Sequence, residues 1–242
     1  MTDGDLAVII PAKDEADRIA LTVKAAHELP GVGLVIVVDD GSADRTAALA
    51  EAAGAKVVRH SRNRGKGAAM ESGAEAARLL DDGPTPRHLL FLDADLAETA
   101  AQAAPLAEPV RRGDADMSIA VFSSTVKLGG HGFVVRLSRD GIKRATGWYA
   151  TQPLNGQRCL TRAAFEAARP LAPGFGVETA LTIDLLRKGY RVTEVEVPLA
   201  HRATGTDWQA QVHRAKQFRD VARALAVRDP AVVDRLGRFR RR

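Results

Sequence analysis

The two acids of Asp93-Ala94-Asp95 carry the most chemistry in this sequence. Two carboxylates at i and i+2, directly after an apolar run, repel each other and are poorly solvated, so they need a cation. Hard oxygen ligands suit Mg²⁺ or Mn²⁺, and either ion can bridge a diphosphate. An Asp-x-Asp pair is common in proteins, so its weight depends on the polar clusters that accompany it.

A second cluster, Asn63-Arg64-Gly65-Lys66-Gly67, opens a segment with helical periodicity. Its glycines allow close approach of the backbone, a helix N-terminus favours an anion, and Lys66 adds a mobile positive charge. The cluster predicts a phosphate-facing loop, with an ordinary helix cap as the alternative. It is not a P-loop, because the sequence contains no Gly-x-x-x-x-Gly-Lys-Ser/Thr.

Two further polar clusters, at residues 11–15 and 39–42, also follow apolar runs. Turn chemistry alone explains any one such cluster, since Asp, Gly and Ser build the turns between strands and helices. Four clusters, each at the end of a strand-like run, favour a shared binding edge.

The elements that must position these clusters are short apolar runs alternating with Ala-rich segments of helical spacing. The runs cover residues 5–11, 33–39, 56–59 and 88–93, and the helices residues 15–29, 44–54 and 67–82. This alternation predicts an α/β fold with a mostly parallel, Rossmann-like sheet and helices on both faces. The carboxyl ends of parallel strands meet at one edge, where open α/β sheets bind ligands.

The second half is less regular. Its residue pattern predicts strands at residues 116–122, 157–160 and 191–197. It predicts helices at residues 134–147, 162–168, 177–188 and 208–227. We expect one domain over residues 1–228, with a nucleotide-binding half (1–96) and a second half (97–228). A basic tail, residues 229–242, follows.

Composition excludes several classes of protein. With 45% apolar and 27% charged residues the chain is globular, and its single cysteine, Cys159, excludes a disulfide framework or a cysteine-rich metal site.

No apolar run approaches the roughly 18 residues that span a bilayer, and no secretory signal is visible, so a cytoplasmic location is expected. The net charge of +5 comes largely from the tail, which predicts at most peripheral membrane contact. Sparse aromatics argue against a nucleic-acid partner.

Together, these clusters resemble the nucleotide-sugar-dependent glycosyltransferases of the GT-A fold, family two and its relatives. The matching segments occur in family order at residues 8–15, 38–42, 63–67 and 93–95. Downstream, Pro153-Leu154-Asn155-Gly156, residues 174–178 and Ala200-His201-Arg202 look most like glucosyl-3-phosphoglycerate synthases.

The resemblance implies a role for each matching residue. Residues implied in binding the nucleotide-sugar donor are Pro11, Ala12, Lys13, Glu15, Asp39, Asp40, Lys66, Asp93 and Ala94. Glu178, Asp93 and Lys66 would be catalytic, and Asp95 with His201 would hold Mg²⁺ or Mn²⁺. Residues implied in binding the acceptor are Asn155, Gly156, Arg136 and Glu178. By itself, Glu178 could equally be a helix N-terminal acid, and His201 a surface imidazole.

The function expected is a metal-dependent glycosyltransferase that uses a UDP- or GDP-sugar. Its acceptor would be a small phosphorylated or carboxylated molecule or a polyprenyl phosphate, and both inverting and retaining transfer are compatible with these residues. A nucleotidyltransferase that makes a nucleotide sugar and a non-catalytic sugar-nucleotide-binding protein are the alternatives. The C-terminal helix is compatible with a homodimer.

Overall fold

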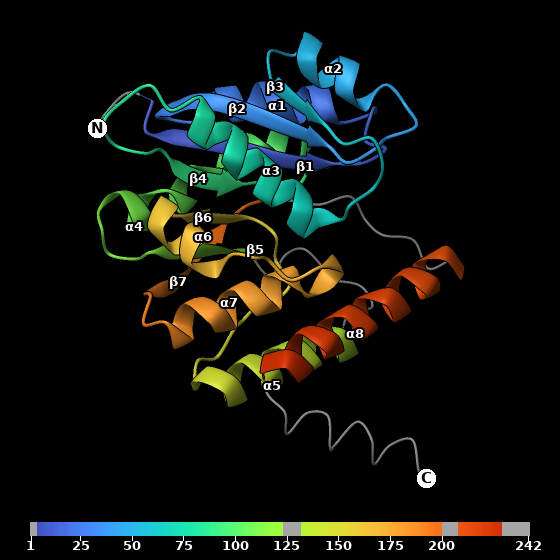
Figure 1. The fold of residues 1–242 in the computed structure, drawn as a ribbon, viewed down its shortest axis with the longest axis vertical. Coiled ribbons are helices and arrows are strands. Elements are labelled where there is room, and N and C mark those ends of the chain that lie inside the picture. The colour runs from blue at the N-terminus through green and yellow to red at the C-terminus, as the bar shows by residue number, and fades with distance from the viewer. Residues whose placement is uncertain (1–3, 123–131, 200–207, 229–242) are drawn as a thin grey trace.

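The structure, a computed structural model, describes residues 4–122, 132–199 and 208–228. Within them a seven-stranded sheet has the order β3-β2-β1-β4-β6-β5-β7 (Figure 1). The strands are β1 (Leu6–Ala12), β2 (Val32–Asp39), β3 (Lys56–Arg59), β4 (His88–Phe91), β5 (Met117–Phe122), β6 (Arg158–Leu160) and β7 (Val192–Val197). The helices are α1 (Ile19–His27), α2 (Thr46–Ala52), α3 (Lys66–Leu79), η1 (Ala97–Leu106), α4 (Glu108–Arg111), α5 (Gly132–Thr146), α6 (Arg162–Ala168), η2 (Gly174–Gly176), α7 (Val177–Arg187) and α8 (Trp208–Arg228).

The sheet is mostly parallel, as predicted. β1 pairs in parallel with β2 and β4, β2 with β3, and β5 with β7. β6 is antiparallel to both β4 and β5. Because β6 runs the other way, Arg158 at its start lies opposite Phe91 at the end of β4. The segment 153–156 therefore meets the same edge of the sheet as Asp93.

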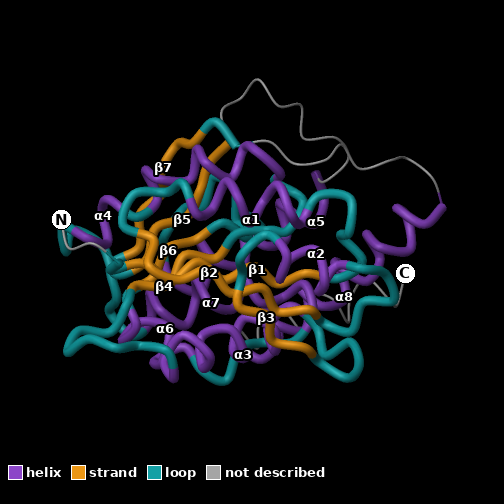
Figure 2. The backbone as a smooth tube through the Cα atoms, turned by 90° about the horizontal axis from the view of Figure 1, so that it is seen from above, coloured by secondary structure: helices purple, strands orange, loops and turns teal. Residues whose placement is uncertain are grey.

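Helices cover both faces of the sheet, as predicted (Figure 2). Alternate β1 residues face opposite ways, as a pleated strand requires: Val8 and Ile10 belong to a core with Val23 of α1. Ile9 belongs to a second core with Met70 of α3. Both β1 faces are buried, which explains why this strand is a continuous apolar run.

Two stretches differ most from the sequence-based expectation. The first helix was expected from residue 15 but begins at Ile19, because side chains of the neighbouring turn bind the backbone before it. The N–H groups of Asp14 and Glu15 donate to Ser42 Oγ and Thr46 Oγ1, and Asp14 has φ +55°. Such side-chain bonds compete with helix formation. Residues 97–111, for which no element was predicted, form η1 and α4.

Three helices of the second half, α5, α7 and α8, pack against one another beside the sheet (Figure 1). Their shared core includes Ile142, Ile183, Val221 and Leu225. A Cβ added to Gly141 would lie 2.3 Å from Leu225 Cδ2, so α5 and α8 are in close contact there. In the part of the chain that the structure describes, no helix is long and apolar enough to cross a bilayer.

Candidate active site

Lys66, Asp93 and Glu178 form one charged cluster at the carboxyl edge of the sheet. Lys66 Nζ donates to Asp93 Oδ1 at 2.7 Å and lies 2.9 Å from Glu178 Oε1. The side chains come from the first residue of α3, the turn after β4 and the first turn of α7. The fold thus brings together the three residues predicted to be catalytic.

The side chain of Glu178 is only 9% exposed. One expectation about this cluster needs correction. Lys66 was expected to be a mobile charge, but it is held between two carboxylates. Burial alone would lower the pKa of Lys66; the charges of Asp93 and Glu178 outweigh that effect and raise the pKa above its ordinary value. Lys66 is therefore a fixed cation.

Gly156 leaves room for the contact between Lys66 and Asp93. A Cβ added at Gly156 would lie 2.3 Å from Lys66 Nζ and 2.8 Å from Asp93 Oδ1. Neither distance is tolerable for a real Cβ atom, so a larger residue would push the Lys66–Asp93 pair apart. The predicted acceptor residue Gly156 thus lies directly against the charged cluster.

The cluster lines a pocket of about 200 Å³. Its walls combine charged, polar and apolar side chains: Lys66, Asp93, Leu154, Phe175, Glu178 and Gln217. The pocket is small and contains convergent polar groups beside apolar surface, which is typical of a site for a small ligand.

Arg158, which the sequence analysis did not single out, lies behind this pocket. Its guanidinium is fully buried and donates to the carbonyl oxygens of Pro153 at 3.2 Å, Asn155 at 2.9 Å and Glu178 at 3.0 Å. It also donates to Thr182 Oγ1 at 2.8 Å. Burial lowers the pKa of Arg158 to about 10, while nearby carboxylates, Glu178 first among them, oppose that shift. Arg158 therefore ties the segment before β6 to the first turn of α7.

The turn that carries Asp93 and Asp95 is held by α1. Thr22 Oγ1 donates to the Ala94 carbonyl at 2.8 Å and accepts from the Ala97 N–H at 2.9 Å. Arg18, the residue directly before α1, donates to the Asp95 carbonyl at 3.1 Å. α1 and the residue before it therefore fix the backbone that carries the two acids.

Asp40 organises the loop that leads to Lys66. It accepts from the N–H groups of Arg64 and Gly65, each at 2.8 Å, and from His60 Nδ1 at 2.7 Å. Burial would raise the pKa of Asp40, but these hydrogen bonds outweigh burial and lower it. His60 Nε2 in turn lies 2.9 Å from Ser72 Oγ on α3. These contacts fix the loop between β3 and α3.

The remaining residues predicted to bind the donor lie along the ends of β1 and β2. The register pairs Ala12 with Asp39, and Asp39 Oδ1 accepts from the Ser42 N–H at 3.0 Å. Pro11 precedes Ala12 on β1, and Ala94 is buried in the turn after β4. Beyond Ala12, Lys13 is exposed, and its Nζ lies 2.7 Å from Asp14 Oδ2. Glu15 is half-buried. The four predicted clusters thus share one edge.

The predicted acceptor and metal residues are only partly brought together. Asn155 is buried, and its Oδ1 accepts from the Gln157 N–H at 3.0 Å. Arg136 is exposed on α5, donates to the Gly132 carbonyl and does not line the pocket. His201 lies outside the described residues. Within those residues, no group of three His, Cys, Asp or Glu side chains could hold a metal ion.

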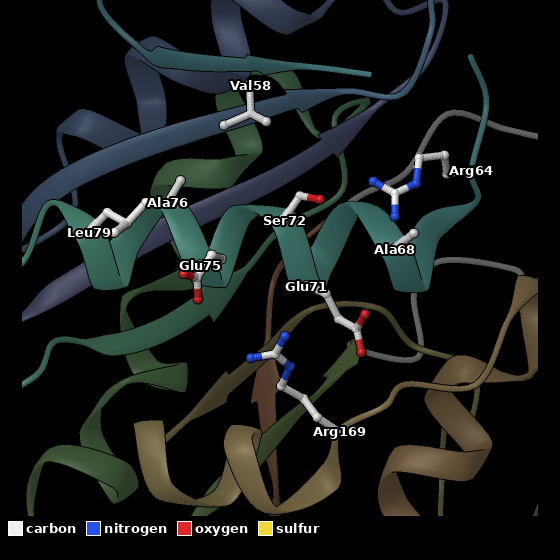
Figure 3. A pocket seen from close by; sticks show the side chains of 9 residues that line it. All are labelled: Val58, Arg64, Ala68, Glu71, Ser72, Glu75, Ala76, Leu79 and Arg169. Carbon is white, nitrogen blue, oxygen red and sulfur yellow. The ribbon is translucent and has the colours of Figure 1, made fainter. Parts of the chain in front are cut away.

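A second hollow of about 410 Å³ runs along the outer side of α3 (Figure 3). Its lining residues are Val58, Arg64, Ala68, Glu71, Ser72, Glu75, Ala76, Leu79 and Arg169. Glu71 accepts from the Leu171 N–H at 2.7 Å, which joins α3 to the segment after α6. Arg64, from the cluster predicted to face a phosphate, lines this hollow, but none of the residues to which the resemblance assigned a role in catalysis, donor binding, acceptor binding or metal binding does.

The family model for glycosyl transferase family 2 matches residues 7–159. The matched range contains all four polar clusters, the segment that ends in Gly156 and nearly the whole of β6. The chain therefore belongs to glycosyl transferase family 2, as the resemblance predicted.

Two curated relatives are similar over most of the chain. Glycosyltransferase AglJ of Haloferax volcanii is 30% identical over 213 residues, which are 85% of this chain and 66% of the relative. Glucosyl-3-phosphoglycerate synthase of Mycolicibacterium paratuberculosis is 30% identical over 204 residues, which are 74% of this chain and 59% of the relative. The chain thus spans about two thirds or less of the length of these relatives.

The structure resembles solved glucosyl-3-phosphoglycerate synthases. The Mycobacterium tuberculosis enzyme in complex with Mn²⁺, UDP and phosphoglyceric acid superposes with a TM-score of 0.75 at 26% identity, over 92% of this chain and 78% of that chain. The predicted fold class, a GT-A α/β fold, is confirmed by this similarity.

Proposed function

We propose that this protein is a metal-dependent glycosyltransferase that transfers a sugar from a UDP-sugar to a small phosphorylated or carboxylated acceptor. The observation that carries the proposal is the Lys66–Asp93–Glu178 cluster, which lines a pocket at the carboxyl edge of a family 2 sheet. The choice of UDP is supported by the solved structural neighbours, whose complexes contain UDP.

In this proposal the donor nucleotide lies along the ends of β1, β2 and β4. Pro11, Ala12, Lys13 and Glu15 would border the nucleoside, with Asp39 and Asp40 shaping the adjoining turn. Lys66, Asp93 and Ala94 would lie toward the diphosphate and sugar. Asp40 would contribute mainly through the loop that it binds, since its carboxylate already accepts three hydrogen bonds.

The side-chain oxygens available as metal ligands fit a divalent cation. Asp93 and Asp95 supply carboxylate oxygens from a turn that α1 holds in place, and such oxygens suit Mg²⁺ or Mn²⁺. Asp95 and His201 would hold the ion together with oxygens of the donor diphosphate. Solved synthases contain Mn²⁺ or Mg²⁺ with UDP. When bound, the ion would neutralise charge on the departing diphosphate.

The residues of the cluster have separate tasks. Lys66 is a fixed cation, and a preorganised positive charge beside a leaving diphosphate stabilises the negative charge that develops there. Asp93 holds Lys66 from one side and meets the donor, and Glu178 holds Lys66 from the other side and meets the acceptor hydroxyl. Asn155 and Gly156 border the acceptor, and Arg136 would attract its anionic group from α5.

A small anionic acceptor is favoured over a polyprenyl phosphate. A solved glucosyl-3-phosphoglycerate synthase that the structure resembles is in complex with phosphoglyceric acid. A cytoplasmic location, a homodimer and peripheral membrane contact through residues 229–242 remain part of the proposal.

A ligand-binding panel tests the donor assignment. Thermal unfolding is followed with UDP, GDP, UDP-glucose and GDP-mannose, each with Mn²⁺, Mg²⁺ or a chelator. A ligand at about 100 times its Kd should add about 2.7 kcal/mol to the free energy of unfolding. We expect a metal-dependent shift with a UDP ligand. A folded protein that responds to none of them would favour a non-catalytic role, and release of pyrophosphate from a nucleoside triphosphate would favour a nucleotidyltransferase.

Asp95→Ala tests the metal assignment. We expect a loss of sugar transfer of at least roughly a hundredfold and loss of the metal-dependent shift, with little change in unfolding temperature without ligand. Asp17→Ala, at an exposed position before α1, is the matched control. Normal sugar transfer by Asp95→Ala would contradict the metal site.

A further inference from the structure

Gln217 is a polar residue of the active-site pocket that no sequence cluster contains. It lies on α8, the C-terminal helix, and lines the pocket with Lys66, Asp93 and Glu178. Its Oε1 is buried and has no hydrogen-bond partner among the described residues. A buried acceptor without a partner is unfavourable, so a ligand that donates a hydrogen bond to it would bind more tightly.

Gln217 is held in place by the anchoring of α8. Three residues later, Asp220 Oδ2 accepts from the Phe175 N–H at 3.2 Å. A Cβ added to Gly176 would lie 2.6 Å from the Asp220 carbonyl oxygen, so α8 directly contacts the turn that precedes Glu178. The same helix therefore supports the turn before a catalytic residue and supplies an amide to the pocket.

The chemistry of the pocket indicates which group Gln217 recognises. Lys66 contributes one positive charge, while Asp93 and Glu178 contribute two negative charges, so a neutral group is favoured beside Gln217. Leu154 and Phe175 add apolar walls. A sugar suits these walls, because its neutral hydroxyls form hydrogen bonds with carboxylates and amides and its ring face packs on apolar side chains.

We infer that Gln217 is a specificity-determining residue, whose amide oxygen accepts a hydrogen bond from one hydroxyl of the sugar in the nucleotide donor. This inference rests on the proposed function. A site built to bind a substrate hydroxyl rejects an analogue that lacks it, because the buried polar group is then left without a partner. α8 thereby becomes part of the donor site.

The experiment measures Kd by calorimetry for UDP, UDP-glucose and the analogues of UDP-glucose that each lack one ring hydroxyl. The proteins are the wild type, Gln217→Met, Gln217→Ala and the control Lys216→Ala, at an exposed position on the same helix. In the wild type, one deoxy analogue should bind roughly tenfold more weakly than UDP-glucose. In both Gln217 variants the ratio of the Kd for this deoxy analogue to the Kd for UDP-glucose should fall close to one, while the Kd for UDP stays unchanged. Lys216→Ala should behave as the wild type.

The outcomes separate this inference from the proposed function. If the wild type binds UDP-glucose but the Gln217 variants discriminate among the analogues as the wild type does, the assignment of Gln217 is wrong and the donor site stands. The assignment is also wrong if no deoxy analogue binds the wild type more weakly. If the wild type binds neither UDP nor UDP-glucose, the proposed function itself is overturned. Gln217→Ala keeps the test valid should the longer Met side chain disturb folding.

Discussion

At the scale of single residues, the candidate active site depends on how closely a few atoms approach. A Cβ at Gly156 would lie 2.3 Å from Lys66 Nζ, so the Lys66–Asp93 contact as observed requires a residue without a side chain at this position. This is a packing requirement, in addition to the acceptor contact that the resemblance implied. The charge cluster and the glycine therefore act as one unit.

Gly156→Ala should separate the Lys66–Asp93 pair. We expect sugar transfer to fall roughly tenfold to a hundredfold, since displacement of a catalytic group by about 1 Å has effects of that size. The free energy of unfolding should fall by about 1–3 kcal/mol because the added methyl group overpacks the site. Initial rates and denaturant unfolding measure the two effects.

Gly83→Ala is the matched control, because a Cβ at Gly83 meets no atom within 4 Å. It should leave the transfer rate and the stability near their wild-type values. If Gly156→Ala behaves like Gly83→Ala, the close approach of Gly156 to the charge cluster has no functional consequence.

At the scale of elements, the reversed strand β6 and its first residue explain how the two halves meet. Because β6 is antiparallel, the segment 153–156 enters at the edge where β4 ends. Arg158 then joins that segment to the first turn of α7 through backbone carbonyls and Thr182. A buried guanidinium thus positions Gly156 and Glu178 relative to each other.

Arg158→Met should destabilise the protein strongly. It removes the donors of three buried carbonyls and one hydroxyl, and we expect a loss of roughly 3 kcal/mol or more in the free energy of unfolding. Urea unfolding measures this change. Arg112→Met is the matched control: Arg112 is 65% exposed and pairs with an exposed Asp114, and such surface pairs contribute about 0–1 kcal/mol. Equal losses in the two variants would contradict the positioning role of Arg158.

At the scale of the whole molecule, charged contacts link distant segments of the chain. Asp40 binds the loop before α3, and Asp116, which directly precedes β5, accepts from Arg191, which directly precedes β7. For both carboxyls burial alone would raise the pKa, but hydrogen bonds outweigh burial and lower the pKa. Their charged forms therefore contribute to the stability of the fold.

The free energy of unfolding should consequently depend on pH in the acidic range. A carboxyl whose pKa is lower in the folded protein stabilises it fully above the ordinary value of 3.8, and this contribution is lost as the pH falls through the lower folded value. Thermal unfolding between about pH 6 and about pH 2 measures the loss. Asp40→Asn and Asp116→Asn should each lower the stability at pH 6 and flatten its decline. An unchanged slope in both variants would contradict this account.

Much of the fold could be predicted because the local signals were consistent. The strand predicted at residues 5–11 is apolar from Leu6 onward, since both of its faces are buried, and α6 was predicted with its observed bounds. The first helix was misplaced at its start, because the groups that hold residues 14–16 lie some thirty positions away, as in the bond from the Asp14 N–H to Ser42. A single sequence window contains no sign of such a partner.

The α/β class and the edge where the polar clusters gather could be predicted from the sequence, because periodicity and turn residues are local properties of the chain. The resemblance to the family implied that Lys66, Asp93, Glu178 and Gly156 act in one site. The tertiary structure added that Lys66 is held by two carboxylates, that Glu178 is buried, that Gly156 lies directly against the Lys66–Asp93 pair and that Arg158 and Gln217 lie beside the same cluster. These features depend on distances between residues remote in sequence, and the packing of the helices and the reversed strand β6 sets those distances.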